Sequence, residues 1–82
     1  SRFWDDCILC NRRTRNRGVF FPEKGGELGA QVDKIRVVIY PICYKHVDTE
    51  DKAKEAAQNA ENYIYSHPEK FNNLTDHYKR LL

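Results

Sequence analysis

The chain has 82 residues, of which 40% are hydrophobic and 32% charged, and its formal net charge is +2 at pH 7. This length predicts one domain over residues 1–82, with a small core that benefits from a staple such as a metal ion. The sequence has no apolar run of about 18 residues, so we expect no membrane-spanning helix. Three cysteines are an odd number, which argues against a secreted disulfide framework.

Reduced, metal-binding thiols are the better interpretation, and they predict an intracellular protein of the cytoplasm or nucleus. Because the chain does not begin with Met, we expect it to be processed or cut from a longer protein.

The first element is a bracket formed by Cys7 and Cys10, separated by two residues. This spacing lets both thiolates reach one metal ion from a tight turn. An arginine-rich loop follows over residues 11–18. Residues 1–47 carry nine Lys/Arg and five Asp/Glu, a net charge of +4, whereas residues 48–82 carry five and seven, a net charge of −2. The basic excess therefore lies in the half that holds the bracket.

Two strands are predicted next. Val19–Phe21 is a short β-prone segment that Pro22 ends, and the glycine-rich residues 23–30 indicate a turn or flexible loop. Lys34–Tyr40 is the strongest strand signal, because it is rich in β-branched and aromatic residues. We expect the two strands to pair as a hairpin with a long connection, so that knuckle and hairpin occupy about residues 1–42. The alternation of the second strand divides its side chains between two faces: Ile35, Val37 and Ile39 on one, Arg36, Val38 and Tyr40 on the other.

A helix is predicted after Asp48 or Thr49, either of which can cap its N-terminus. Acidic residues follow in its first turn, where they complement the helix dipole, and Glu50 lies four residues before Lys54, the favourable order for an ion pair. Apolar residues recur at helical spacing along one face: Ala53, Ala56, Ala57, Ala60 and Ile64.

A second helix is predicted from about His67 to the end of the chain, which completes a helical part over about residues 43–82. Ser66 and Glu69 have the spacing of a capping box, and Pro68 suits a first-turn position. The inner face of this helix comprises Phe71, Leu74, Tyr78 and Leu81.

A second ligand pair, Cys43 and His46, lies between the long strand and the first helix. The two pairs together offer three thiolates and one imidazole, a tetrahedral donor set that structural zinc prefers. We predict one structural Zn²⁺ bound by Cys7, Cys10, Cys43 and His46. Four protein ligands close the coordination shell, whereas a catalytic zinc keeps one position for water.

Other interpretations of these residues stay open at this stage. The cysteines could be ordinary buried thiols, the first pair could be a redox dithiol, or the zinc could be catalytic. No βαβ pattern surrounds Cys7 and Cys10, which disfavours the redox dithiol. His67 or His77 could replace His46 as the fourth ligand, but both lack the two-residue spacing and are expected at the surface.

The order of knuckle, hairpin and second ligand pair before a helix resembles a treble-clef zinc finger over roughly residues 3–65. The resemblance implies a small zinc-stabilised α+β domain, with knuckle and hairpin followed by two helices. The chain departs from the pattern at Asn11, where such knuckles usually place glycine, and in its long hairpin connection. Treble-clef nucleases of the His-Asn-His type need a histidine on the hairpin. Residues 11–42 contain none, which argues against nuclease activity. No acid/base or nucleophile pair is visible beyond the predicted metal ligands, so we expect no enzyme activity.

The arginine-rich loop is the candidate binding surface. Guanidinium groups match phosphate geometry, and several phosphate contacts produce salt-dependent, sequence-tolerant binding. Phe20, Phe21 and Tyr40 are near in sequence and could stack on bases. We expect a non-catalytic zinc-stabilised module that contacts DNA or RNA through these residues: Arg12, Arg13, Arg15, Arg17, Lys34 and Arg36.

Three alternatives for the arginine-rich loop are a solvated loop, a contact with an acidic protein surface, and compensation of the negative charge of three thiolates around Zn²⁺. The alternative function is a protein-interaction or regulatory module that uses the C-terminal helices and exposed tyrosines. The candidates are Tyr40, Tyr44, Tyr63, Tyr65 and Tyr78. The sequence does not decide between DNA and RNA, and it does not indicate an oligomeric state.

Overall fold

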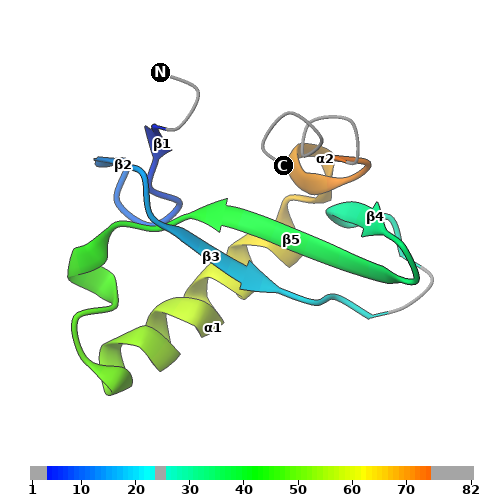
Figure 1. Ribbon diagram of the computed structural model, residues 1–82. Coiled ribbons are helices and arrows are strands. Elements are labelled where there is room, and N and C mark those ends of the chain that lie inside the picture. The colour runs from blue at the N-terminus through cyan, green and yellow to red at the C-terminus, as the bar shows by residue number, and fades with distance from the viewer. Residues whose placement is uncertain (1–3, 24–25, 75–82) are drawn as a thin grey trace.

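A computed structural model describes residues 4–23 and 26–74 of the chain. It is a mixed α+β fold with two antiparallel sheets and one long helix (Figure 1), so the predicted α+β class is confirmed. In these residues, no helix has both the length and the apolar character needed to cross a membrane. The elements in chain order are β1 (Asp5–Asp6), β2 (Arg13–Thr14), β3 (Arg17–Phe20), β4 (Ala30–Val32), β5 (Ile35–Pro41), the 3₁₀ turn η1 (Tyr44–His46), α1 (Glu50–Ser66) and α2 (Pro68–Phe71).

The first cysteine pair lies in the turn of a short hairpin formed by β1 and β2. The Cys7 N–H donates to the Arg12 carbonyl at 2.8 Å, and the Asn11 N–H donates to the Cys7 carbonyl at 2.9 Å. Asn11 has a φ of 65°, a left-handed conformation that asparagine adopts more readily than most other residues. Asn11 therefore takes the conformation for which such knuckles usually use glycine.

The main sheet has the strand order β3-β5-β4, and both pairings are antiparallel. Val19 faces Ile39 and Phe20 faces Val38, so the predicted pairing of the two strands is confirmed. The observed bounds of β3 and β5 differ from the predicted ones by one or two residues.

β4 is a strand that the sequence does not predict, and it lies in the connection between the two predicted strands. It pairs with β5, with Ala30 opposite Val37 and Val32 opposite Ile35. Gly29 precedes β4 with a φ of 69°, and a Cβ atom there would overlap the Val37 carbonyl. Glycine permits this approach, so the glycine-rich connection brings an edge strand onto β5.

The core lies between the main sheet and α1, which runs behind the sheet in Figure 1. The buried residues of α1 are three members of the predicted apolar face: Ala56, Ala60 and Ile64. They share one cluster with Phe20, Val38 and Tyr40 of the sheet. The buried face of β5 is therefore the one that carries Val38 and Tyr40, while Ile35 on the other face is 50% exposed. Small alanine side chains let the helix approach the sheet closely.

The N-terminus of α1 agrees with its prediction. The Thr49 side chain accepts a hydrogen bond from the Lys52 N–H at 3.2 Å, which satisfies one of the free N–H groups of the first turn. Glu50 lies 3.5 Å from Lys54, as the spacing predicts.

Among the described residues, the predicted second helix is confirmed over its first turn only, because residues 72–74 are not helical. α2 spans four residues with Pro68 at its start, and its N-cap residue, His67, makes no side-chain capping bond. The Ser66 hydroxyl instead donates to the Tyr63 carbonyl at 2.9 Å, so the capping-box interpretation is also wrong. Tyr78 and Leu81 of the predicted inner face lie outside the described residues.

The end of α2 is fixed by contacts with the segment before β4. The Gly29 N–H donates to the Phe71 carbonyl at 2.6 Å, and the Leu74 N–H donates to the Gly29 carbonyl at 2.8 Å. Asn72 is extended and Asn73 has a φ of 57°, so neither continues the helix. Pairing with a distant segment therefore decides where this helix stops.

Candidate metal centre and basic cleft

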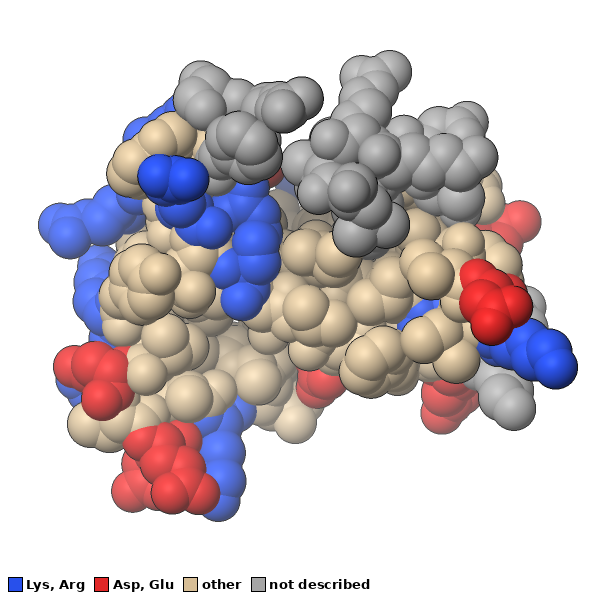
Figure 2. All heavy atoms as spheres, viewed as in Figure 1, with Lys and Arg blue, Asp and Glu red and all other residues tan. Residues whose placement is uncertain are grey.

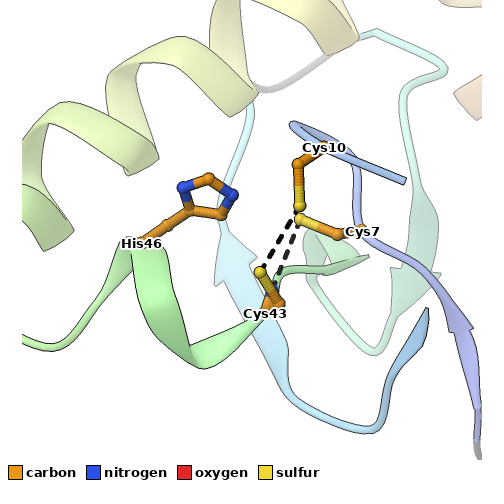
Figure 3. Close-up of side chains that lie close together, drawn as sticks. All are labelled: Cys7, Cys10, Cys43 and His46. Carbon is orange, nitrogen blue, oxygen red and sulfur yellow. Dashed lines mark hydrogen bonds between the residues drawn. The ribbon is translucent and has the colours of Figure 1, made fainter. Parts of the chain in front are cut away.

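The structure brings all four predicted metal ligands together (Figure 3). Cys7 and Cys10 come from the β1–β2 turn, Cys43 follows β5, and His46 ends η1. Their ligand atoms lie within 4.8 Å of one another, so they could coordinate one metal ion. In a tetrahedral site with metal–sulfur bonds of about 2.3 Å, the sulfurs are about 3.8 Å apart. Shifts on the order of 1 Å therefore convert the cluster into such a site.

The sulfur atoms have the surroundings of a metal–thiolate centre. The Leu9 and Cys43 N–H groups each donate to the Cys7 sulfur at 3.4 Å, and the Cys10 and Cys43 sulfurs are 3.5 Å apart. All three cysteines are free thiols, and Cys7 is completely buried. Thiolates this close together in a buried site need a cation to balance their charge.

His46 adds independent evidence for a ligand. Its Nε2 atom is buried, and no group in the described part of the chain lies at hydrogen-bonding distance and geometry from it. Leaving a buried polar atom unpaired costs about 1–3 kcal/mol, so proteins rarely do so. In Figure 3 the imidazole lies beside the three sulfurs. Coordination of a metal ion there satisfies this nitrogen, so the donor set fits a metal.

The cysteines differ in their tendency to ionise. The N–H of Arg12, followed by the nearby His46 imidazole, lowers the pKa of Cys10 from 9.0 to about 6. Burial raises the pKa of Cys43 above 9.0. Because the thiolate is the metal-binding form, Cys10 is ready to bind at neutral pH, whereas binding at Cys43 must displace a proton.

The alternative fourth ligands do not join this cluster in the structure. His67 stacks on Tyr63 with ring centroids 4.1 Å apart, and its Nδ1 lies 2.8 Å from the Tyr63 carbonyl. His77 lies outside the described residues. Among the histidines that the structure describes, His46 is therefore the one placed with the sulfurs.

Hydrogen bonds hold the arginine-rich loop against the residue that follows β5. Asn16 donates through Nδ2 to the Ile42 carbonyl at 2.9 Å, and its own carbonyl accepts from the Ile42 N–H at 3.1 Å. The buried Thr14 hydroxyl accepts from the Asn16 N–H at 3.0 Å. Because Ile42 immediately precedes Cys43, these bonds connect the loop directly to the second ligand pair.

A cleft of about 570 Å³ lies next to Cys43, on the arginine side of the metal centre. Among the residues that the structure describes, its lining includes four cationic side chains and no acidic one: Arg12, Arg13, Arg15 and Lys45. Figure 2 shows Lys and Arg side chains gathered at the end of the molecule that carries β1 and β2. Asp6 lies 3.7 Å from Arg13, but both side chains are mostly exposed and the pair offsets little of the charge.

The six residues predicted to bind nucleic acid do not all lie at one site in the structure. Arg12, Arg13 and Arg15 line the cleft. Arg17 donates to the carbonyls of Thr14 and Asn16, so its guanidinium supports the loop. Lys34 immediately precedes β5 and Arg36 is its second residue, so both lie at the end of this strand opposite Cys43. The length of the strand separates them from Cys43 by about 20 Å, at roughly 3.3 Å per residue. Arg36 also donates to the carbonyls of residues 27–29, which fixes the segment before β4.

The cleft also contains three residues that the sequence did not predict for nucleic-acid binding: Trp4, Lys45 and Tyr44, the last of which was a candidate for protein contact only. The aromatic residues predicted to stack on bases lie elsewhere, because Phe20 and Tyr40 are buried and Phe21 follows the far end of β3. Each of the three unpredicted residues lies within three positions of a metal-ligand cysteine, and that proximity is the signal that could have identified them.

Comparisons with known proteins identify no family for the chain. No protein-family model matches it, and no curated protein or solved structure gives a match. The cluster of Cys7, Cys10, Cys43 and His46 is compatible with a zinc-binding fold.

Proposed function

We propose that the chain is a non-catalytic, zinc-stabilised module that binds nucleic-acid phosphates through the basic cleft. The observation that supports this most is the position of Cys43, which belongs to the metal cluster and also lines the cleft. The residues that hold the metal therefore also position the cationic side chains.

Zinc is the metal favoured by the donor set, because three thiolates and one imidazole form a common structural zinc site. Four protein ligands leave no position for a reacting water, which supports a structural role. The order of knuckle, hairpin, ligand pair and helix supports a treble-clef-like arrangement. Apparent binding free energies of about 10–16 kcal/mol for structural zinc are large compared with the stability of a small domain.

Charge supports phosphate as the ligand. The cleft carries four cations, whereas three thiolates around Zn²⁺ leave the adjacent centre with a formal charge of −1. The cations of the cleft therefore outnumber the negative charge of the adjacent centre. Three of the four cations are arginines, whose guanidinium groups bind phosphate oxygens in a two-pronged geometry.

The test is the salt dependence of binding to a fluorescently labelled oligonucleotide, followed by anisotropy of the zinc-loaded protein. If all four cleft cations contact phosphates of a single strand, the association constant should fall as the salt concentration rises. A plot of the logarithm of the association constant against the logarithm of the salt concentration should have a slope of about −3. A variant with Arg12, Arg13, Arg15 and Lys45 replaced by Ser should lose most of the affinity and of this slope.

A matched control removes the same charge elsewhere, by replacing four other exposed lysines with serine: Lys34, Lys52, Lys54 and Lys70. This control should retain most of the affinity, and it also tests the sequence-based assignment of Lys34. Equal weakening by both variants would mean that binding follows net charge and not the cleft.

A second candidate function is a protein-interaction module. The sheet face turned away from α1 exposes three apolar side chains: Val19 at 51%, Ile35 at 50% and Val32 at 39%. This face points towards the viewer in Figure 2. Tyr44 and Tyr65 are also more than half exposed. Contiguous apolar surface of this kind is typical of contact sites. A partner captured after nuclease treatment, and lost when Val19 and Ile35 become Ser, would favour this function.

A further inference from the structure

The basic cleft combines its cations with exposed aromatic rings. Trp4 is 44% exposed and Tyr44 is 69% exposed, and both line the cleft together with the arginines. The Arg15 guanidinium lies 5.9 Å from the centroid of the Trp4 ring. An unpaired nucleotide is bound by two such components: a cation contacts its phosphate, and an accessible aromatic ring stacks on its base.

We propose, on the basis of the proposed function, that the cleft is a site for single-stranded nucleic acid. An unpaired base stacks on Trp4 or Tyr44, while the flanking phosphates contact Arg12, Arg13 and Lys45. Bases in a duplex are already stacked on one another and present only their edges, so they cannot use an aromatic ring in this way. Because every base has a π face, the binding is tolerant of sequence.

The shape of the cleft supports the same choice. Its volume of about 570 Å³ lies within the range of about 300–1,000 Å³ that is typical of small-molecule sites, so it has room for a nucleotide. Proteins that read duplex DNA usually insert a convex helix or ribbon into a groove. The described residues at this site form a concave surface, and their one helical element, η1, has three residues.

The local backbone also prepares the two rings for binding. Trp4 immediately precedes β1, and Tyr44 begins η1 directly after the metal-cluster residue Cys43. Both rings are therefore attached to elements that converge at the metal cluster. A site whose backbone is held in place loses less conformational entropy when its ligand binds.

The experiment compares four ligands on zinc-loaded protein at one ionic strength: oligothymidylate, an abasic oligonucleotide of the same length, a duplex of that length, and a polyglutamate peptide of similar charge. Trp4 is the sole tryptophan in the chain, so its fluorescence reports directly on stacking. Oligothymidylate should quench this fluorescence and bind most tightly. The abasic strand should bind more weakly, with little quenching.

Variants separate stacking from charge, with affinity measured by the anisotropy of labelled ligands. Trp4→Leu and Tyr44→Leu should together weaken oligothymidylate binding by about 5- to 150-fold for each base that loses its stack. Their affinity for the abasic strand should not change. Phe21→Leu is the matched control, because this exposed ring lies outside the cleft and its loss should leave both affinities unchanged. Far-UV circular dichroism and zinc content verify that each variant is folded.

The two levels of the proposal fail differently. If the abasic strand or the duplex binds as tightly as oligothymidylate, or the two aromatic variants bind normally, the stacking site is refuted while phosphate binding stands. If polyglutamate binds as tightly, the cleft is a general site for acidic polymers and single-strand recognition is refuted. If none of the nucleic acids binds, both this inference and the proposed function are wrong.

Discussion

Replacing His46 by Ala tests whether one metal ion holds the fold together. His46 supplies one of four candidate ligands, and its buried Nε2 has no hydrogen-bond partner among the described residues. If structural zinc contributes about 10–16 kcal/mol, an even share for one ligand is about 2.5–4 kcal/mol. We expect His46→Ala to lower the free energy of unfolding by about this amount at saturating zinc.

The stability lost by His46→Ala should depend on whether zinc is present, and this dependence is the critical test. Total stability of a small domain is about 5–15 kcal/mol, so complete removal of the zinc should abolish cooperative unfolding. With a strong chelator present, the wild-type chain and His46→Ala should therefore behave alike in urea titrations followed by circular dichroism. The control is His67→Ala. His67 stacks on Tyr63 away from the sulfurs, so the stability lost in this variant should not come from the loss of a zinc ligand.

Two results would refute this reasoning. One is cooperative melting of the wild-type chain after metal analysis has verified that zinc is absent. The other is an equal loss of stability for His46→Ala with and without zinc, which would make the imidazole a packing residue.

Three further predictions concern the core and the ligands. Ile64→Ala should cost about 2–5 kcal/mol in urea unfolding, because Ile64 is completely buried between helix and sheet; a loss below about 1 kcal/mol would contradict the core assignment. Gly18→Ala should cost about 1–3 kcal/mol and lower the melting temperature, because the new Cβ would overlap the ring of Tyr40, and an unchanged melting temperature would count against this packing. The lowered pKa of Cys10 keeps its thiolate present above about pH 6 and protonates it as the pH falls through that value. Because burial raises the pKa of Cys43, zinc must displace a proton from this thiol. The apparent zinc affinity, measured with a zinc-sensitive dye, should therefore fall as the pH is lowered from about 8 to about 6, by about tenfold per pH unit for each displaced proton, and an affinity that does not change with pH would contradict this assignment.

The features that the sequence predicts well are those with local causes. The Thr49 cap and the alanine spacing of α1 depend on residues within a few turns of each other. The two ligand pairs are equally local, because two-residue spacing brings both members of a pair to one side of a tight turn. The prediction that the two pairs lie together required only the assumption that they share one metal ion. The structure places their ligand atoms together.

The features that the sequence misses depend on pairing between separate segments of the chain. Ala30–Val32 is too short to show a strand pattern, and it becomes β4 because Gly29 can approach Val37 on β5. The predicted second helix stops at Phe71, because the backbone that follows pairs with the residues before β4. Local propensity registers neither interaction, because each is a pairing between separate segments: β4 with β5 across a short connection, and Asn72 with the distant Leu28.

The buried face of β5 shows how the core and the metal centre depend on one another. By hydrophobicity alone, the face with Ile35 and Val37 is the better candidate for burial, yet Val38, Tyr40 and Ile42 face the core. The chain then continues directly into Cys43, which belongs both to this cluster and to the metal site. The metal centre is therefore an extension of the core. Because Tyr44 and Lys45 follow at once, metal binding, core packing and the shape of the cleft are linked through a single stretch of backbone.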